Sequence, residues 1–249
     1  AGPMPGDPQM APAPKGSYLA AATQPPGNLR IAFRQTDLQG NAIDPEVASA
    51  VGATAKLLRE LGHEVEEASP EGFSEEAIAG PFQVLWSVGA TSQIDIFSRL
   101  TGKPIDWDLL EPATRAFYED GQRRSAADYV AAWDALQGLG RQFGRFFEDY
   151  DVWLSPTLAS PPEKLGSFDV RRTDIDSVYE ELIRYIPYTP LLNATGQPAI
   201  SLPLQQSSSG LPLGMMFAGS FGAEELLYSL AGQLEEALPW KERRPLVWG

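Results

Sequence analysis

The end of the chain, over residues 187–219, constrains the fold more than any other part of the sequence. Gly196 suits the C-terminal stop of a helix, and Pro198 follows at a position where a helix does not continue. Residues 199–204 and 213–218 are apolar runs of strand length, separated by small polar residues typical of a hairpin loop. The order helix, stop, strand, loop, strand predicts a sheet with a helix leading into it.

A second pattern, near the start of the chain, predicts a parallel crossover. Residues 28–33 form a short apolar run typical of a buried strand. Asp44 can cap the helix that follows, and Pro45 suits its first turn. Apolar residues then recur at helical spacing until Gly62, and residues 63–67 predict a second strand. Strand, helix and strand in this order favour two parallel neighbours in one sheet.

The remaining elements follow from apolar periodicity and from breaker residues. They are a helical region opened by Ser74 with irregularities at Pro81 and Gly89, a short helix at 113–119 within loops at 101–124, a helix at 125–150, a strand at 151–157, a loop at 158–175, a helix at 176–186 and a last helix at 226–238. Together they predict an α/β fold, a mixed β-sheet flanked by helices. Residues 1–27, rich in Pro and Gly, predict an extended linker before an α/β portion at 28–249.

Composition excludes several classes of function. The 249 residues carry a formal net charge of -14, which argues against binding to nucleic acid or to an anionic membrane surface. The sequence has no Cys, so a disulfide framework, a cysteine nucleophile and a thiolate metal site are excluded. His63 is the one histidine, which we expect to be a structural or surface residue, and we expect no metal site and no cofactor. The absence of Cys and of a long apolar run favours a cytoplasmic protein.

No catalytic motif can be recognised in these residues. The run Ser207 to Ser209 resembles a serine loop superficially, but its place between two apolar runs favours a turn. Ser92 and Ser155 remain as alternative nucleophiles for a new type of hydrolase, each with an acid nearby. Adjacent acidic residues, as at Glu66 and Glu67, point apart on a strand or helix and predict solvated faces.

The run from Pro187 to Leu204, followed by the run from Gly210 to Gly219, resembles the carboxy-terminal part of the amidase signature family. The members of this family are serine hydrolases that cleave carboxamides. The resemblance implies a reaction carried out by two Ser and one Lys, with backbone amides of a Gly- and Ser-rich loop stabilising the oxyanion. Neither that loop nor the Lys is present in these residues, so we assign no catalytic residue to this chain.

The resemblance implies that the helix before Gly196 presents one face to the acyl pocket. Ile183, Ile186 and Pro190 fall at successive turn spacings, so we predict that they line the pocket. Phe82 and Trp86, on another predicted helix, are the candidates for the opposite wall.

Two residues at the joint between that helix and the following strand have predicted structural roles. We expect Asn193 to be buried and to hydrogen-bond to the backbone. Gly196 is the predicted helix stop.

The leading hypothesis is a carboxy-terminal chain or fragment of an amidase signature hydrolase, which acts on linear carbon–nitrogen amide bonds through an acyl-serine intermediate. This chain would supply scaffold and pocket wall, with the amino-terminal catalytic half as its partner and a small amide as substrate. Alone it is predicted to be inactive. The alternative is a non-catalytic, amidase-like module that binds a small molecule.

Overall fold

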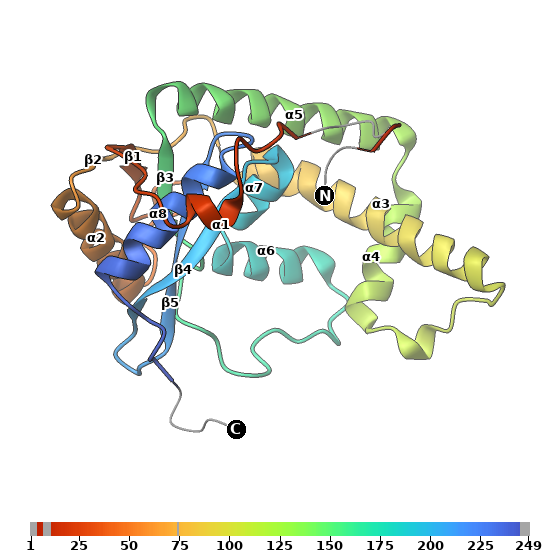
Figure 1. Ribbon diagram of the computed structural model, residues 1–249. Helices are drawn as coiled ribbons and strands as arrows, with labels where there is room; N and C mark the ends of the chain where they lie inside the picture. Colours follow the sequence, from red (N-terminus) through yellow and green to blue (C-terminus); the bar gives the residue numbers. More distant parts are fainter. Residues whose placement is uncertain (1–3, 7–10, 74, 245–249) are drawn as a thin grey trace.

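The computed structural model describes residues 4–6, 11–73 and 75–244, which are organised around one five-stranded sheet (Figure 1). The strand order is β2 (Glu64–Glu67), β1 (Arg30–Phe33), β3 (Val152–Pro156), β5 (Pro212–Gly219), β4 (Ala199–Gln206). β1 is parallel to both β2 and β3, whereas β5 is antiparallel to β3 and β4. The prediction of a mixed sheet flanked by helices is confirmed.

The parallel crossover is formed by β1, α2 (Pro45–Glu60) and β2. The Asp44 side chain caps α2 by accepting hydrogen bonds from the N–H groups of Glu46 and Val47, at 2.8 and 3.4 Å. Gly62, after the end of the helix, has a positive φ of 96°, which glycine adopts at little cost. Local sequence chemistry thus determines where this helix begins and where it ends.

Each face of the sheet has its own apolar core, because successive strand residues point to opposite faces. On one face, side chains of β1, β3, β4 and β5 pack against α2 and α8 (Glu224–Ala237). On the other face, side chains of β1, β3 and β5 pack against α5 (Ala126–Asp149) and α7 (Thr189–Thr195). Trp153, on the central strand β3, is fully buried in the second core.

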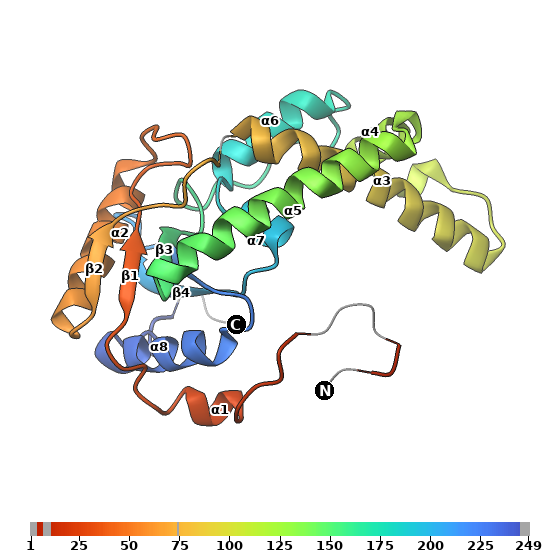
Figure 2. The ribbon, with the colours of Figure 1, turned by 90° about the horizontal axis from the view of Figure 1, so that it is seen from above.

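Two further helices extend beyond the sheet. α3 (Glu75–Thr101) and α4 (Pro112–Arg123) pack together on the side away from α2, as Figure 2 shows. Gly121 of α4 allows their close approach, because a Cβ there would lie 2.2 Å from the backbone oxygen of Ser87. Within the described residues, no helix combines the length and the apolar character that a membrane span requires.

Several predictions about local structure are wrong. The predicted extended linker at 1–27, of which residues 1–3 and 7–10 lie outside the described residues, contains a short helix, α1 (Tyr18–Ala21), which lies along α8. The segment 101–124, predicted mainly as loop, holds the short 3-10 helix η1 (Trp107–Leu109) and the whole 12-residue α4, which is longer than the helix predicted at 113–119. α3 continues through Pro81 and Gly89 without a break. The predicted start at Ser74 lies outside the described residues.

The chain before the hairpin forms two helices rather than one. α6 (Ile175–Tyr185) ends at Ile186, and α7 begins at Thr189. Pro187 explains the break, since it lacks an N–H and disfavours helical geometry in the residue before it. Ile186 accordingly has φ −119° and ψ 55°. This break sets the shape of the site described next.

Candidate substrate pocket

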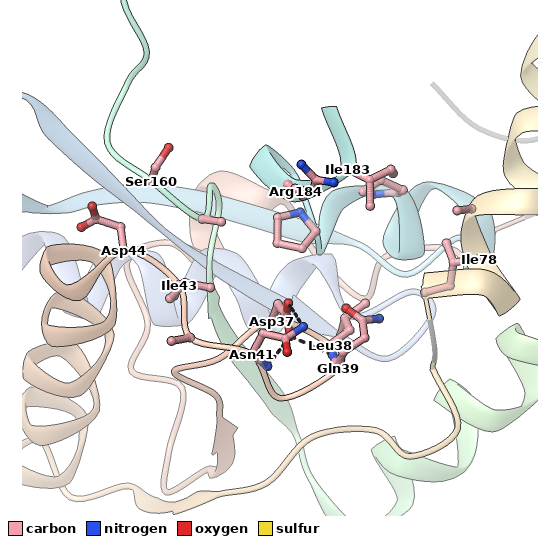
Figure 3. A pocket seen from close by; sticks show the side chains of 15 residues that line it. Asp37, Leu38, Gln39, Asn41, Ile43, Asp44, Ile78, Ser160, Ile183 and Arg184 are labelled. Carbon is pink, nitrogen blue, oxygen red and sulfur yellow. Dashed lines mark hydrogen bonds between the residues drawn. The ribbon is translucent and has the colours of Figure 1, made fainter. Parts of the chain in front are cut away.

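A cavity of about 410 Å³ lies where β1 and β3 end, at the carboxyl ends of two parallel strands (Figure 3). Open α/β sheets commonly bind ligands at such an edge. Four segments line the cavity: the loop after β1, the start of α3, the loop after β3, and the joint between α6 and α7. The lining residues are Asp37, Leu38, Gln39, Asn41, Ala42, Ile43, Asp44, Ile78, Ala79, Ala159, Ser160, Ile183, Arg184, Pro187 and Pro190.

The loop after β1 is held in shape by its own hydrogen bonds. The Asp37 side chain accepts from the backbone N–H of Gln39 at 2.9 Å and from that of Asn41 at 2.7 Å. The Asn41 side chain donates to the second Asp37 oxygen at 2.9 Å. Gly40 provides the positive φ of 88° that the turn requires. The Asp37 carboxylate is therefore occupied by structural bonds, which Figure 3 shows as dashed lines.

Bonds between the lining segments fix their relative positions. The N–H of Asp44 donates to the carbonyl of Ala159 at 3.0 Å, and the N–H of Ala159 donates to the carbonyl of Tyr185 at 2.9 Å. The Tyr188 hydroxyl donates to the carbonyl of Thr36, which lies in the loop after β1. Burial raises the pKa of Tyr188, which keeps this hydroxyl protonated as a donor. The loops after β1 and β3 and the joint between α6 and α7 thus form one braced frame.

The cavity combines an apolar lining with a polar rim, as small-molecule sites usually do. The apolar residues are Leu38, Ala42, Ile43, Ile78, Ala79, Ala159, Ile183, Pro187 and Pro190. Arg184 reaches the rim from α6, and its side chain is 76% exposed, 3.7 Å from Glu180. The carboxylates of Asp37 and Asp44 are both engaged by backbone N–H groups. This arrangement can hold an apolar group and orient a polar one.

The predicted pocket residues have different positions in the structure. Ile183 and Pro190 both line the cavity, on α6 and α7 respectively. Ile186 is not among the lining residues, and the single helical face assumed for the three residues does not exist, because the helix breaks at Pro187. Whether Ile183 and Pro190 contact a substrate stays a prediction.

Phe82 and Trp86 do not line this cavity. Their rings lie 5.8 Å apart on α3, and Trp86 is 47% exposed beside Phe117 of α4. Ile78 and Ala79, about one turn before Phe82 on α3, contribute to the wall instead. The sequence offered no signal for this choice, because it depends on how α3 lies across the ends of the strands.

The joint between α7 and β4 confirms one structural prediction and corrects another. Gly196 ends α7 with φ 80° and ψ 11°, and its N–H donates to the carbonyl of Leu192 at 2.9 Å. Asn193, in contrast, is exposed, and its side chain makes no hydrogen bond to the described backbone, so the predicted burial is wrong. A polar residue one turn before a helix stop was expected to brace the joint, but α7 turns it towards solvent.

The alternative nucleophiles lie apart from the cavity. Ser155 is fully buried on β3, where its hydroxyl donates to the carbonyl of Pro156 at 3.2 Å. Ser92 is exposed on α3. His63 is 5% exposed; its Nδ1 accepts from the N–H of Leu29 at 3.2 Å, and its Nε2 lies 2.8 Å from the Gln233 side-chain oxygen. This histidine is structural, as predicted. No cluster of three potential metal ligands occurs in the described part of the chain.

The fold is that of amidase signature enzymes. It superposes with a TM-score of 0.86 on a solved 6-aminohexanoate cyclic dimer hydrolase, at 29% sequence identity over 98% of this chain and 52% of the other. The sequence is 31% identical over 97% of its length to the 6-aminohexanoate-cyclic-dimer hydrolase of Pseudomonas sp. strain NK87, and 30% identical to that of Paenarthrobacter ureafaciens.

The amidase family model matches residues 1–228, so the chain belongs to the amidase family, whose members described here act on amide bonds. The alignment with each of the two 6-aminohexanoate-cyclic-dimer hydrolases covers 50% of that relative. The chain therefore spans about half the length of the curated relatives it matches, and the resemblance recognised in the sequence is confirmed at the level of the family.

Proposed function

We propose that this chain is the carboxy-terminal half of an amidase signature hydrolase, and that it supplies sheet, scaffold and acyl-pocket wall to an active site whose nucleophile lies in the complementary half. The observation that carries the proposal is a braced, mainly apolar cavity at the strand ends, with no lysine or histidine among its lining residues. Its one lining serine, Ser160, directs its hydroxyl to the carbonyl of Pro161 at 3.3 Å and to Glu163 at 3.5 Å. Family membership and the half-length match support it.

The chemistry follows from what amide cleavage requires. A serine of the complementary half attacks the carbonyl carbon, the amine leaves with a proton, and water then hydrolyses the acyl-serine. The present chain holds the acyl part of the substrate against Ile183 and Pro190, and orients a polar end near Arg184. Positioning of this kind contributes to the rate by fixing the geometry of attack. No cofactor is needed.

The proposed substrate is a small amide with a short aliphatic acyl chain. A cavity of about 410 Å³ with an apolar lining fits such a group. The related hydrolases named above act on a cyclic dimer of 6-aminohexanoate, which also has aliphatic chains between its amides. Composition favours a cytoplasmic location, because the chain has no cysteine.

The experiment compares this chain alone, the complementary half alone and the mixture. The complementary half is the part of the Pseudomonas sp. NK87 relative that lies outside the match, and the substrate is the 6-aminohexanoate cyclic dimer. We expect hydrolysis in the mixture and none by this chain. Turnover by this chain alone, or labelling of its Ser92 or Ser155 by a serine-directed fluorophosphonate, would contradict the proposal.

The pocket prediction has its own variants. Ile183→Trp fills the cavity and is expected to raise KM for the cyclic dimer about tenfold or more in the active mixture. The reason is that it removes contacts that the bound substrate and the transition state share, so kcat should change little. Phe82→Ala, on the same side of the molecule but outside the cavity, is the control and should leave KM nearly unchanged. Equal effects of the two variants would argue against this cavity as the acyl site.

The second candidate function, a non-catalytic module that binds a small molecule, rests on the same cavity. It predicts that this chain alone binds the cyclic dimer as tightly as the mixture does. Calorimetry of both preparations separates the two functions, because a half-site should bind the dimer weakly.

A further inference from the structure

Arg34 is a half-buried cation directly after β1, behind the wall of the cavity. Its backbone N–H still pairs with the sheet, donating to the carbonyl of Leu154 at 3.2 Å. Its Nε donates to the Thr36 hydroxyl at 2.9 Å, and its Nη1 donates to the Ser69 hydroxyl at 2.7 Å. The side chain therefore joins the loop after β1 to the loop after β2.

The partners of Arg34 are unusual for a charge in this position. Charges that leave water are normally paired with an opposite charge. Within the part of the chain that the structure describes, Arg34 forms no ion pair, and both of its side-chain partners are neutral hydroxyls. A guanidinium holds its donors in a rigid, planar fork, which a Lys ammonium does not have. This arrangement favours a role in placing the two loops rather than in neutralising a charge.

Thr36 is held from a second side by Tyr188. The Tyr188 hydroxyl donates to the carbonyl of Thr36, whereas Arg34 binds the Thr36 side chain. Tyr188 is fully buried, and its ring packs edge-on against that of Trp153, with the centroids 5.9 Å apart. The sheet core thus fixes the ring, and the ring fixes the carbonyl.

Thr36 in turn is the base of the loop that forms one wall of the cavity. It pairs with Ala42 in an isolated antiparallel bridge, and the N–H of Asp37 donates to the carbonyl of Asn41 at 3.0 Å. Leu38 lies inside this closed loop; it is 8% exposed, packs in the core with α5 and α7, and also lines the cavity. Figure 3 shows Leu38 beside Asp37 and Asn41 on this wall. The position of Thr36 therefore decides where the wall stands.

We propose that Arg34 and Tyr188 are positioning residues of the acyl pocket, which hold Thr36 from two sides and so set how far Leu38 and Ala42 reach into the cavity. Neither Arg34 nor Tyr188 lines the cavity itself. The inference rests on the proposed function, since it takes this cavity as the acyl site. Productive sites are held to within about 0.5 Å by hydrogen bonds and packing behind the residues that touch the ligand.

Two conservative variants each remove one hold on Thr36. Arg34→Lys keeps the charge but loses the fork, and Tyr188→Phe keeps the ring but loses the hydroxyl. This full chain is mixed with the part of the Pseudomonas sp. NK87 relative outside the match, and the substrate is the cyclic dimer. Each variant should raise KM about tenfold with little change in kcat, because a displaced wall weakens the binding of substrate and transition state alike.

The division between KM and kcat separates positioning from stability. A variant that is only less stable reduces the amount of active protein, and so lowers the apparent kcat without raising KM. Arg30→Lys, at the other end of β1, and Tyr150→Phe, whose hydroxyl bonds to Glu66, are the matched controls. Both residues lie outside the cavity lining, and their variants should leave KM within about twofold of the parent value.

A third variant tests whether Arg34 acts through Thr36. Thr36→Val removes the hydroxyl that Arg34 binds but keeps the carbonyl that Tyr188 binds. Because Arg34→Lys and Thr36→Val break the same link, the double variant should raise KM no further than either single variant. Multiplied effects on KM would contradict this path. Thermal melts show which variants are folded, and Arg34→Lys and Thr36→Val keep the proposal testable if Tyr188→Phe is not tolerated.

Hydrogen exchange in the free chain tests the same hold without turnover. The N–H of Asn41 donates to the Asp37 carboxylate at 2.7 Å, and the N–H of Asp37 closes the loop as described above. Arg34→Lys and Tyr188→Phe should each speed exchange of the Asp37 and Asn41 amides about tenfold. The Ala48 amide, which donates to the carbonyl of Asp44 in the first turn of α2, is the internal control and should not change.

The outcomes separate the two proposals. Unchanged exchange at Asp37 and Asn41 in both variants overturns the positioning role, whether or not the mixture is active. Faster exchange with a normal KM in an active mixture, or a lower kcat alone, shows that the two residues only stabilise the loop; the positioning role is then wrong and the proposed function stands. If the parent mixture does not hydrolyse the dimer, the proposed function fails, and the positioning role fails with it.

Discussion

The two faces of β4 differ in how the rest of the chain covers them. On one face, Leu202 and Leu204 are buried under α2 and α8 in a core that the chain completes by itself. On the other, Ala199 and Ser201 are exposed. The difference teaches that the first, closed face of the strand contributes to the stability of the fold, whereas the second, open face is left uncovered by the described residues.

The largest effect should come from the closed face. Leu204→Ala removes a side chain that is 1% exposed, and should lower the free energy of unfolding by about 2–5 kcal/mol. Chemical denaturation measures it. Leu211→Ala, in the adjoining loop and 41% exposed, is the control and should cost less than about 1 kcal/mol. Similar losses for the two variants would mean that the closed face is not a packed core.

The second prediction concerns the contact between α1 and α8. A Cβ on Gly232 would lie 1.9 Å from the carbonyl oxygen of Ala22, so Gly232→Ala should displace α1 and cost about 1–3 kcal/mol. Gly144→Ala is the matched control, because a Cβ at that exposed position of α5 meets nothing within 4 Å. It should instead stabilise the chain by about 0.5–1 kcal/mol. Denaturation of both variants gives the sign, and a neutral Gly232→Ala would show that α1 is not held by this contact.

The contrast between the faces also explains how far the sequence could predict the structure. Elements set by local chemistry were predictable: Asp44 and Pro45 begin α2, and Gly196 ends α7. The apolar run at 199–204 predicted the strand β4. It did not predict which face of the strand is covered, because that depends on where the helices lie across the sheet.

The site was predictable in part for the same reason. Ile183 and Pro190 could be chosen from their spacing, although Pro187 breaks the helix that the spacing assumed. Ile78 and the loop after β1 come from distant parts of the sequence, and the fold alone brings them to the cavity. Asn193 was expected to be buried from its polarity and position, but burial is decided by tertiary packing, which leaves it exposed.

The third prediction tests the open face directly. Ser201→Ala deletes the hydroxyl that lies 2.6 Å from that of Thr157, and should cost less than about 1 kcal/mol because the group is exposed and water replaces the bond. Differential scanning calorimetry of the free chain measures this loss against Leu204→Ala on the same strand. A loss as large as that of the leucine variant would remove the distinction between the two faces.

The smallest expected effect is a dependence on pH at the rim of the closed face. Glu46 of α2 accepts hydrogen bonds from the Ser208 hydroxyl at 2.5 Å and from its N–H at 3.1 Å, and so joins α2 to the hairpin loop. These two bonds lower the pKa of Glu46 below its ordinary value of 4.5.

Because the pKa of Glu46 is lower in the folded chain than in the unfolded one, its contribution to stability is complete above that ordinary value and is lost as pH falls through the folded pKa. Glu46→Gln should therefore be slightly less stable than the parent chain at neutral pH, and the difference in the free energy of unfolding should shrink as the pH falls below 4.5. Glu60→Gln, on the same helix and paired with the exposed Lys56 at 3.7 Å, is the control. A gap that stays constant across the denaturation series would show that the Glu46 charge makes no contribution to the joint.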